Sequence, residues 1–184
     1  MNILFAGSPH SAAKVLDSLS NESNINIKAV ITQPDKRGKR GSKLIESAVA
    51  NKARSLNIKT FKPEYLDNDN LKAELSSIDV EFLIIVAYGK IIPSWLLNLP
   101  TVSPINIHFS ILPKYRGASP IQSAILNGDT STGISIIKMN NELDSGDIYP
   151  VFEQNIKEDD DKISLEKKLT ELCLYDARQG LLNK

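Results

Sequence analysis

Short apolar runs alternate with amphipathic segments along the whole chain. The apolar runs predict strands at 3–6, 27–31, 81–87, 103–109, 133–139 and 148–154. Apolar residues at helical spacing predict four helices. The first ends near residue 19, the second spans 44–56, the third begins at residue 120, and the fourth runs from 163 to about 182. This alternation predicts an α/β domain with a Rossmann-like, mostly parallel twisted sheet and helices on both faces.

Composition narrows the possible chemistry. The 184 residues suffice for one domain, and a net charge of +0 means that any nucleic-acid contact must come from a local basic patch. Two histidines, His10 and His108, and one cysteine, Cys173, exclude a disulfide and a site of several imidazoles or thiolates, so we expect no metal. Without a leader or a membrane-length apolar run, we expect a cytoplasmic protein that has no membrane partner.

The predicted strand at 103–109 carries two polar side chains on one face. Because side chains alternate along a strand, Asn106 and His108 point one way, while Ile105, Ile107 and Phe109 point the other. An amide beside an imidazole at a strand end can hold a carbonyl oxygen as it becomes an oxyanion. A structural histidine with a satisfied hydrogen bond is the alternative, and the strand alone leaves it open.

Several loops are predicted to meet at one edge of the sheet. In open α/β sheets, ligands bind beyond the carboxyl ends of the strands, where Gly7, the Tyr88-Gly89 pair and the segments 106–113 and 140–144 are expected. A carboxylate from Asp144 placed against His108 would orient the imidazole and favour its charged form. Turn formation around Gly146 is the alternative role for Asp144, and it is the role that we prefer for Asp147.

A basic segment follows the second predicted strand. Its five cations lie in a glycine-interrupted stretch without aromatic residues, and they are Lys36, Arg37, Lys39, Arg40 and Lys43. Such a segment suits contact with a phosphate backbone without base reading. A solvated charged surface explains the same pattern equally well.

With these residues assembled, the chain resembles the formyltransferases that use 10-formyltetrahydrofolate, over nearly its whole length. Asn106-Ile107-His108, the loop 110–113 and Asp144 within Leu-Asp-Ser-Gly-Asp match motifs of the whole family. Gln33-Pro34-Asp35 before a basic loop, and the runs 86–93 and 116–122, are more typical of the members that act on methionyl-tRNA. The departures are minor: Ser8 and His10 stand where the family usually has Thr and Glu, and Ile111 replaces a leucine.

The resemblance implies transfer of a formyl group from 10-formyltetrahydrofolate, as co-substrate, to the α-amine of initiator methionyl-tRNA. His108 and Asn106 would stabilise the oxyanion, and Asp144 would orient His108 and assist proton transfer. The residues implied for folate binding are Tyr88, Gly89, Ile91, Ile92, Ser110, Ile111, Leu112, Pro113, Asn140 and Asn141. The basic segment would approach the acceptor stem of the tRNA.

The resemblance also raises a question of domain organisation. Family members that act on tRNA carry a β-barrel domain after the catalytic one. We therefore expect residues 1–184 to form the catalytic domain, with the barrel absent from this chain, and we expect a monomer. Two other functions remain open: a formyltransferase for an amino sugar nucleotide, and a folate- or tRNA-binding module without turnover.

Overall fold

The computed structural model describes residues 1–38, 44–142 and 144–177, apart from the side chains of the last two. The chain divides into two compact units, Met1–Pro104 and Ile105–Lys184, and each is treated by itself. In the described part of the chain, no helix is both long enough and apolar enough to cross a membrane.

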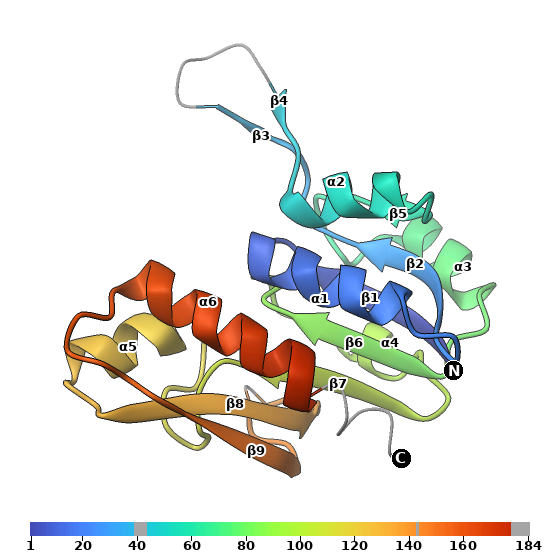
Figure 1. Ribbon diagram of the computed structural model, residues 1–184. Helices are drawn as coiled ribbons and strands as arrows, with labels where there is room; N and C mark the ends of the chain where they lie inside the picture. The colour runs from blue at the N-terminus through green and yellow to red at the C-terminus, as the bar shows by residue number, and fades with distance from the viewer. Residues whose placement is uncertain (39–43, 143, 178–184) are drawn as a thin grey trace. The chain divides into compact units, whose positions relative to one another are not determined.

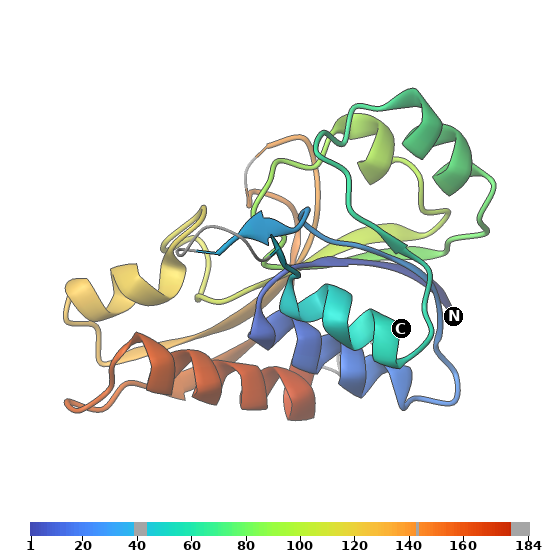
Figure 2. The same ribbon diagram turned by 90° about the horizontal axis from the view of Figure 1, so that it is seen from above.

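Four parallel strands form the sheet of the N-terminal unit. Their order is β5-β2-β1-β6, and they span Thr60–Phe61, Asn26–Ile31, Asn2–Gly7 and Phe82–Val86. Helices α1 (His10–Ser20) and α2 (Ala48–Ser55) cover one face, and α3 (Asp69–Ser76) and α4 (Ser94–Leu97) cover the other (Figure 2). The central strands β1 and β6 are consequently buried on both faces, as their continuous apolar runs predict.

A β-hairpin replaces the beginning of a predicted helix in this unit. The sequence predicts a helix over 44–56, but Leu44–Ile45 forms strand β4, which pairs in antiparallel fashion with β3 (Lys36–Arg37). The helix α2 begins only after Ser47, whose hydroxyl accepts a hydrogen bond from the Ala50 amide and so fixes the start. Figure 1 shows the hairpin extending beyond α2. The short elements β5, α3 and α4 are also additions to the predicted set.

The C-terminal unit contains an antiparallel arrangement. Strand β7 (Ser103–His108) crosses the boundary between the two units, and it pairs with β8 (Ser131–Lys138), which pairs with β9 (Ile148–Asn155). Helix α5 (Pro120–Leu126) begins at Pro120 as predicted, although the Ser119 side chain makes no capping hydrogen bond, and α6 (Lys162–Leu172) packs on β8 and β9 (Figure 1). The predicted closing helix ends earlier than expected, because Cys173–Ala177 forms the π-helical turn η1; the remainder lies outside the described residues.

Candidate active site

Strand β7 brings Asn106 and His108 to one face of the C-terminal unit. Ile105 and Ile107 point to the opposite face and are buried, as the alternation of side chains predicts. His108 is itself only 6% exposed. Its imidazole is therefore largely shielded from solvent, and its two nitrogens need partners within the protein.

Asp144 reaches this face by a route that the sequence does not predict. Because β8 runs antiparallel to β7, Lys138 at its end pairs with Ile105, far from His108 along the strand. The prediction that the segment after β8 lies at the carboxyl end of a parallel strand is therefore wrong. The loop instead folds back, closed by a hydrogen bond from the Lys138 amide to the Asp147 carbonyl (2.9 Å), and it returns Asp144 to Asn106.

The carboxylate of Asp144 is buried and accepts two hydrogen bonds. Its Oδ1 accepts from Asn106 Nδ2 at 3.2 Å, and its Oδ2 accepts from the Gly117 amide at 2.8 Å. The same Oδ2 lies 3.7 Å from His108 Nδ1, which is an ion-pair distance rather than a hydrogen bond. A backbone φ of 44° at Asp144 places the residue in the left-handed region, which Asp tolerates better than most residues.

The hydrogen-bond partner of His108 Nε2 shows which ring nitrogen carries a hydrogen. Nε2 lies 2.9 Å from the carbonyl oxygen of Tyr115. Because a carbonyl oxygen only accepts hydrogen bonds, Nε2 must carry the hydrogen, and Nδ1 is the nitrogen that faces Asp144. Both ring nitrogens thus face acceptor oxygens.

The loop after β7 is held by buried Ser135, which is not among the predicted site residues. The Ser135 hydroxyl donates to the Ser110 carbonyl (2.7 Å) and accepts from the Leu112 amide (3.0 Å). Ser110 in turn donates to the Lys114 carbonyl at 2.7 Å, and both serines are 0% exposed. A serine within the isoleucine-rich run of β8 was the available signal, since a buried hydroxyl needs a partner.

Asp129 holds the far end of the same loop. Its Oδ2 accepts a hydrogen bond from the Tyr115 hydroxyl at 2.7 Å, and its Oδ1 lies 3.2 Å from Lys114 Nζ. The hydrogen bond from Tyr115 lowers the pKa of Asp129 and raises the pKa of the tyrosine. Tyr115 has a left-handed φ of 58°, so this bond fixes a residue whose carbonyl holds His108.

The predicted folate-binding residues are distributed over both units. Tyr88, Gly89, Ile91 and Ile92 lie in the N-terminal unit, whereas Ser110, Ile111, Leu112, Pro113, Asn140 and Asn141 lie in the C-terminal unit. Within the C-terminal unit, Leu112 is buried and precedes a cis peptide bond to Pro113. The Asn140 side chain accepts from the Glu142 amide (2.9 Å) and the Ser145 hydroxyl (3.1 Å), so it shapes the loop that carries Asp144.

In the N-terminal unit, the turn at Tyr88 and Gly89 is tied to the sheet. The Tyr88 carbonyl accepts from Gln33 Nε2 (2.8 Å) and from the Ser8 hydroxyl (3.2 Å), and Gly89 has a φ of 81° that favours glycine. Burial raises the pKa of Tyr88 to about 12. Its hydroxyl has no hydrogen-bond partner among the described residues, while Ile91 nearby is 89% exposed.

The predicted tRNA-binding residues are only partly described. Lys36 and Arg37 form β3 and are exposed, whereas Lys39, Arg40 and Lys43 lie outside the described residues. Over the ranges that the structure describes, no three His, Cys, Asp or Glu side chains are grouped so that they could hold a metal ion.

Comparison with known proteins adds relatives of this chain. It is 44% identical over 172 residues to a methionyl-tRNA formyltransferase of Sulfurihydrogenibium sp. (strain YO3AOP1), covering 93% of this chain and 55% of the relative. A methionyl-tRNA formyltransferase of Caldicellulosiruptor saccharolyticus is 43% identical, with 94% and 56% covered. The chain therefore spans about half the length of these curated relatives.

Solved structures of lower identity share the fold. A phosphoribosylglycinamide formyltransferase from Bacillus halodurans superimposes with a TM-score of 0.78 at 21% identity, covering 99% of this chain and 95% of that one. A sugar N-formyltransferase from a Shewanella species gives 0.70 at 18% identity, with 100% and 70% covered. The predicted Rossmann-like α/β class is thus confirmed. The formyl transferase family model matches residues 1–173, and the chain belongs to that family.

Proposed function

We propose that the protein containing this chain transfers the formyl group of 10-formyltetrahydrofolate to the α-amine of initiator methionyl-tRNA. The cluster of Asn106, His108 and Asp144 carries the proposal, because it brings an amide, an imidazole and a carboxylate together at one face of β7, with His108 and Asp144 buried. The identity of 43–44% to relatives named methionyl-tRNA formyltransferase supports the choice of acceptor.

The reaction is an acyl transfer to nitrogen. The neutral amine attacks the formyl carbon, a carbon–nitrogen bond forms, and the carbonyl oxygen becomes an oxyanion. Asn106 has a second amide hydrogen beyond the one given to Asp144, and the Nδ1–H of a protonated His108 is not committed to a hydrogen bond at 3.7 Å. These two donors stabilise the oxyanion, an effect worth about 10²–10³-fold per donor in comparable sites.

Collapse of the intermediate requires a proton to move. The bond from the formyl carbon to the folate nitrogen breaks as the protonated His108 gives a proton to that nitrogen, and His108 then takes up the proton that the attacking amine loses. The Asp144 carboxylate lies beside His108, and its negative charge stabilises the imidazolium that supplies the proton. Because Nε2 is hydrogen-bonded to the Tyr115 carbonyl, Nδ1 is the nitrogen that remains to exchange a proton with the substrates.

Two sets of residues bind the substrates in this proposal. The residues proposed for folate binding are the turn 88–92 in the N-terminal unit and, separately, the loop 110–113 and the segment 140–141 in the C-terminal unit. The hairpin side chains Lys36 and Arg37, with Lys39, Arg40 and Lys43, contact the phosphate backbone of the tRNA. We also propose that the protein acts as a monomer in the cytoplasm and that residues 1–184 are its catalytic domain.

The test is a formylation assay with 10-formyltetrahydrofolate and charged initiator tRNA. His108→Ala should lower kcat by about 10²–10⁴-fold, because it removes both a proton donor and an oxyanion donor. Folate binding, measured by calorimetry, should remain within about twofold. His10→Ala is the matched control, since His10 is exposed at the start of α1 and should leave kcat unchanged.

Three outcomes would contradict the proposal. Full activity of His108→Ala would remove the role given to the imidazole. Formylation of an amino sugar nucleotide but not of charged tRNA would assign a different acceptor. If the unaltered protein bound folate or tRNA but transferred no formyl group, it would be a binding module and not an enzyme.

A further inference from the structure

A single ammonium group closes the base of the β3–β4 hairpin. Lys62 Nζ lies 2.8 Å from Asp35 Oδ1 and 2.7 Å from Glu46 Oε1. Asp35 immediately precedes β3, and Glu46 immediately follows β4. The two ends of the hairpin are therefore joined through one side chain that belongs to neither strand. We call Asp35, Lys62 and Glu46 the clamp.

The clamp is anchored in the sheet of the N-terminal unit. Lys62 directly follows β5, which pairs with β2 at Val30 and Ile31. Glu46 is additionally paired with Arg54 of α2, through Oε2 and the guanidinium at 2.5 Å. The hairpin base is thus tied both to an edge strand and to a helix.

The clamp residues are shielded enough for these contacts to hold. Their side chains are 24–28% exposed, so salt screens them less than it screens a fully exposed pair. Burial lowers the pKa of Lys62, but its hydrogen bonds to Asp35 and Glu46 outweigh burial and raise it overall. The hydrogen bond from Lys62 lowers the pKa of Glu46, so both partners stay charged at neutral pH.

The hairpin has little else to fix its direction. Among its described residues, its ladder consists of two residue pairs, Lys36 with Ile45 and Arg37 with Leu44. Leu44 and Ile45 are 60% and 58% exposed, so the hairpin buries little apolar surface of its own. A two-stranded ribbon of this kind is marginal in water without outside support.

We propose that Lys62 is a positioning residue for the nucleic-acid acceptor: it clamps Asp35 to Glu46 and so sets the direction in which Lys36 and Arg37 meet the phosphate backbone. This inference rests on the proposed function of the hairpin. Lys62 does not itself bind phosphate, because two carboxylates already neutralise and occupy its ammonium group.

The experiment compares Lys62→Met with Lys59→Met in the purified protein. Lys59 is the matched control, because it lies on the same segment and its ammonium group is paired with Glu74 at 2.8 Å rather than with a carboxylate of the clamp. Lys62→Met should raise the KM for charged tRNA about tenfold, within the 5–150-fold range of ordinary coupling, while kcat and the KM for folate change less than about twofold. Lys62→Arg should restore most of the affinity.

Two further readouts separate positioning from direct contact. The slope of log KM for tRNA against log salt should stay unchanged in Lys62→Met, whereas loss of a phosphate contact would reduce the slope by about 1. Amide hydrogen exchange at residues 35–37 and 44–46 should become faster in Lys62→Met and not in Lys59→Met, because only the former opens the hairpin base.

The possible failures are distinguishable. If Lys36→Ala combined with Arg37→Ala leaves the KM for tRNA unchanged, the hairpin does not bind tRNA, and the proposed function of the hairpin fails together with this inference. If that double variant raises the KM but Lys62→Met does not, the inference alone is overturned. A reduced salt slope in Lys62→Met would equally overturn it, by making Lys62 a phosphate ligand.

Discussion

The carbonyl oxygen of Tyr115 accepts a hydrogen bond from Nε2 of His108 at 2.9 Å. A backbone atom, rather than a side chain, thus decides which imidazole nitrogen faces Asp144. Tyr115 is in turn fixed through its hydroxyl to Asp129. The orientation of His108, the candidate catalytic histidine, therefore depends on Asp129, which acts through Tyr115.

This chain of contacts predicts an effect of Tyr115→Phe. The variant keeps the backbone carbonyl but loses the 2.7 Å hydrogen bond to Asp129, so the carbonyl is held less firmly against His108. We expect kcat to fall about tenfold with little change in the KM for folate, because small misplacements of a catalytic group are costly. Steady-state kinetics checks this, with Tyr175→Phe, an exposed tyrosine, as the control. Equal kcat in the two variants would show that the Asp129 contact is dispensable.

Replacement of Asp144 should separate charge from shape. Asp144→Asn keeps the size of the side chain but removes the negative charge beside His108, and it sets an amide against the Gly117 and Asn106 donors. We expect kcat to fall by about 10²–10⁴-fold, the contribution typical of proton transfer by a positioned group. Asp147→Asn, in the same loop but exposed, should retain full activity. The assignment of Asp144 would be wrong if the two variants behaved alike.

Ser135 should matter for stability more than its single hydroxyl suggests. Ser135→Ala leaves the Ser110 carbonyl and the Leu112 amide without their partner in a buried position. Buried groups left unsatisfied cost about 1–3 kcal/mol in the free energy of unfolding. Ser123→Ala, which removes an exposed hydroxyl on α5, should cost less than about 0.5 kcal/mol. Urea unfolding of the two variants measures the difference directly, and similar losses would contradict the account.

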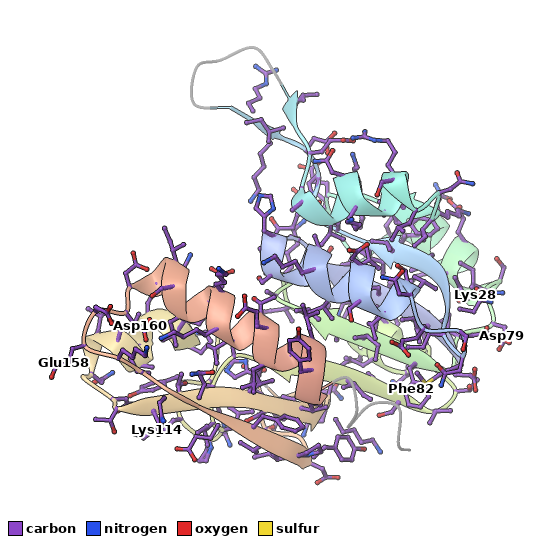
Figure 3. All side chains as sticks on the ribbon, viewed as in Figure 1. Lys28, Asp79, Phe82, Lys114, Glu158 and Asp160 are labelled. Carbon is purple, nitrogen blue, oxygen red and sulfur yellow. The ribbon has the colours of Figure 1, made fainter. Side chains whose placement is uncertain are left out.

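The start of α6 contains a group that links stability to pH. Asp160 accepts hydrogen bonds from Lys168 Nζ (2.6 Å), the Lys157 amide (2.8 Å) and the Ser164 hydroxyl (2.8 Å), and Figure 3 shows it beside that helix. The hydrogen bond from Lys168 is the largest of the effects that lower the pKa of Asp160 to about 2, from an ordinary value of 3.8.

The sign of this effect follows from linkage. Because the folded-state pKa lies below the unfolded one, the stabilisation is full above pH 3.8 and is lost as the pH falls through about 2. Asp160→Asn should therefore lower Tm at pH 7, and the gap to the unaltered protein should close as the pH falls toward 2. Thermal unfolding across this range tests it, and a gap that stayed constant with pH would refute the linkage.

Side-chain patterns made much of the site predictable. Asn106 and His108 follow from strand alternation, and Asp144 follows from the family motif, whereas the return of its loop to β7 does not follow from the order of the strands. The atoms that hold His108 and Asp144 in place could not be predicted from the sequence, because the Tyr115 carbonyl and the Gly117 amide are backbone groups that every residue possesses. Their position depends on left-handed turns at Tyr115 and Gly117 that no side-chain pattern specifies.

The errors in the predicted fold have local causes. Leu44 and Ile45 fit the helical spacing of the residues after them, but the Ser47 cap starts the helix later and leaves them to pair with β3. The direction of β8 could not be read from its apolar run, because a buried strand has the same composition in either direction. A glycine at 146 permits the resulting return loop, since a Cβ there would lie 1.7 Å from the Lys138 carbonyl oxygen.

The clamp at the hairpin base has a consequence for protein engineering. A hairpin moved from one scaffold to another is usually cut where its strands end, which here would mean residues 36 and 45. Such a graft would omit Asp35, Glu46 and Lys62, and the direction of the transferred hairpin would no longer be fixed by their contacts. A transplantable cassette is therefore discontinuous: it comprises residues 35–46 together with a lysine taken from a separate part of the chain.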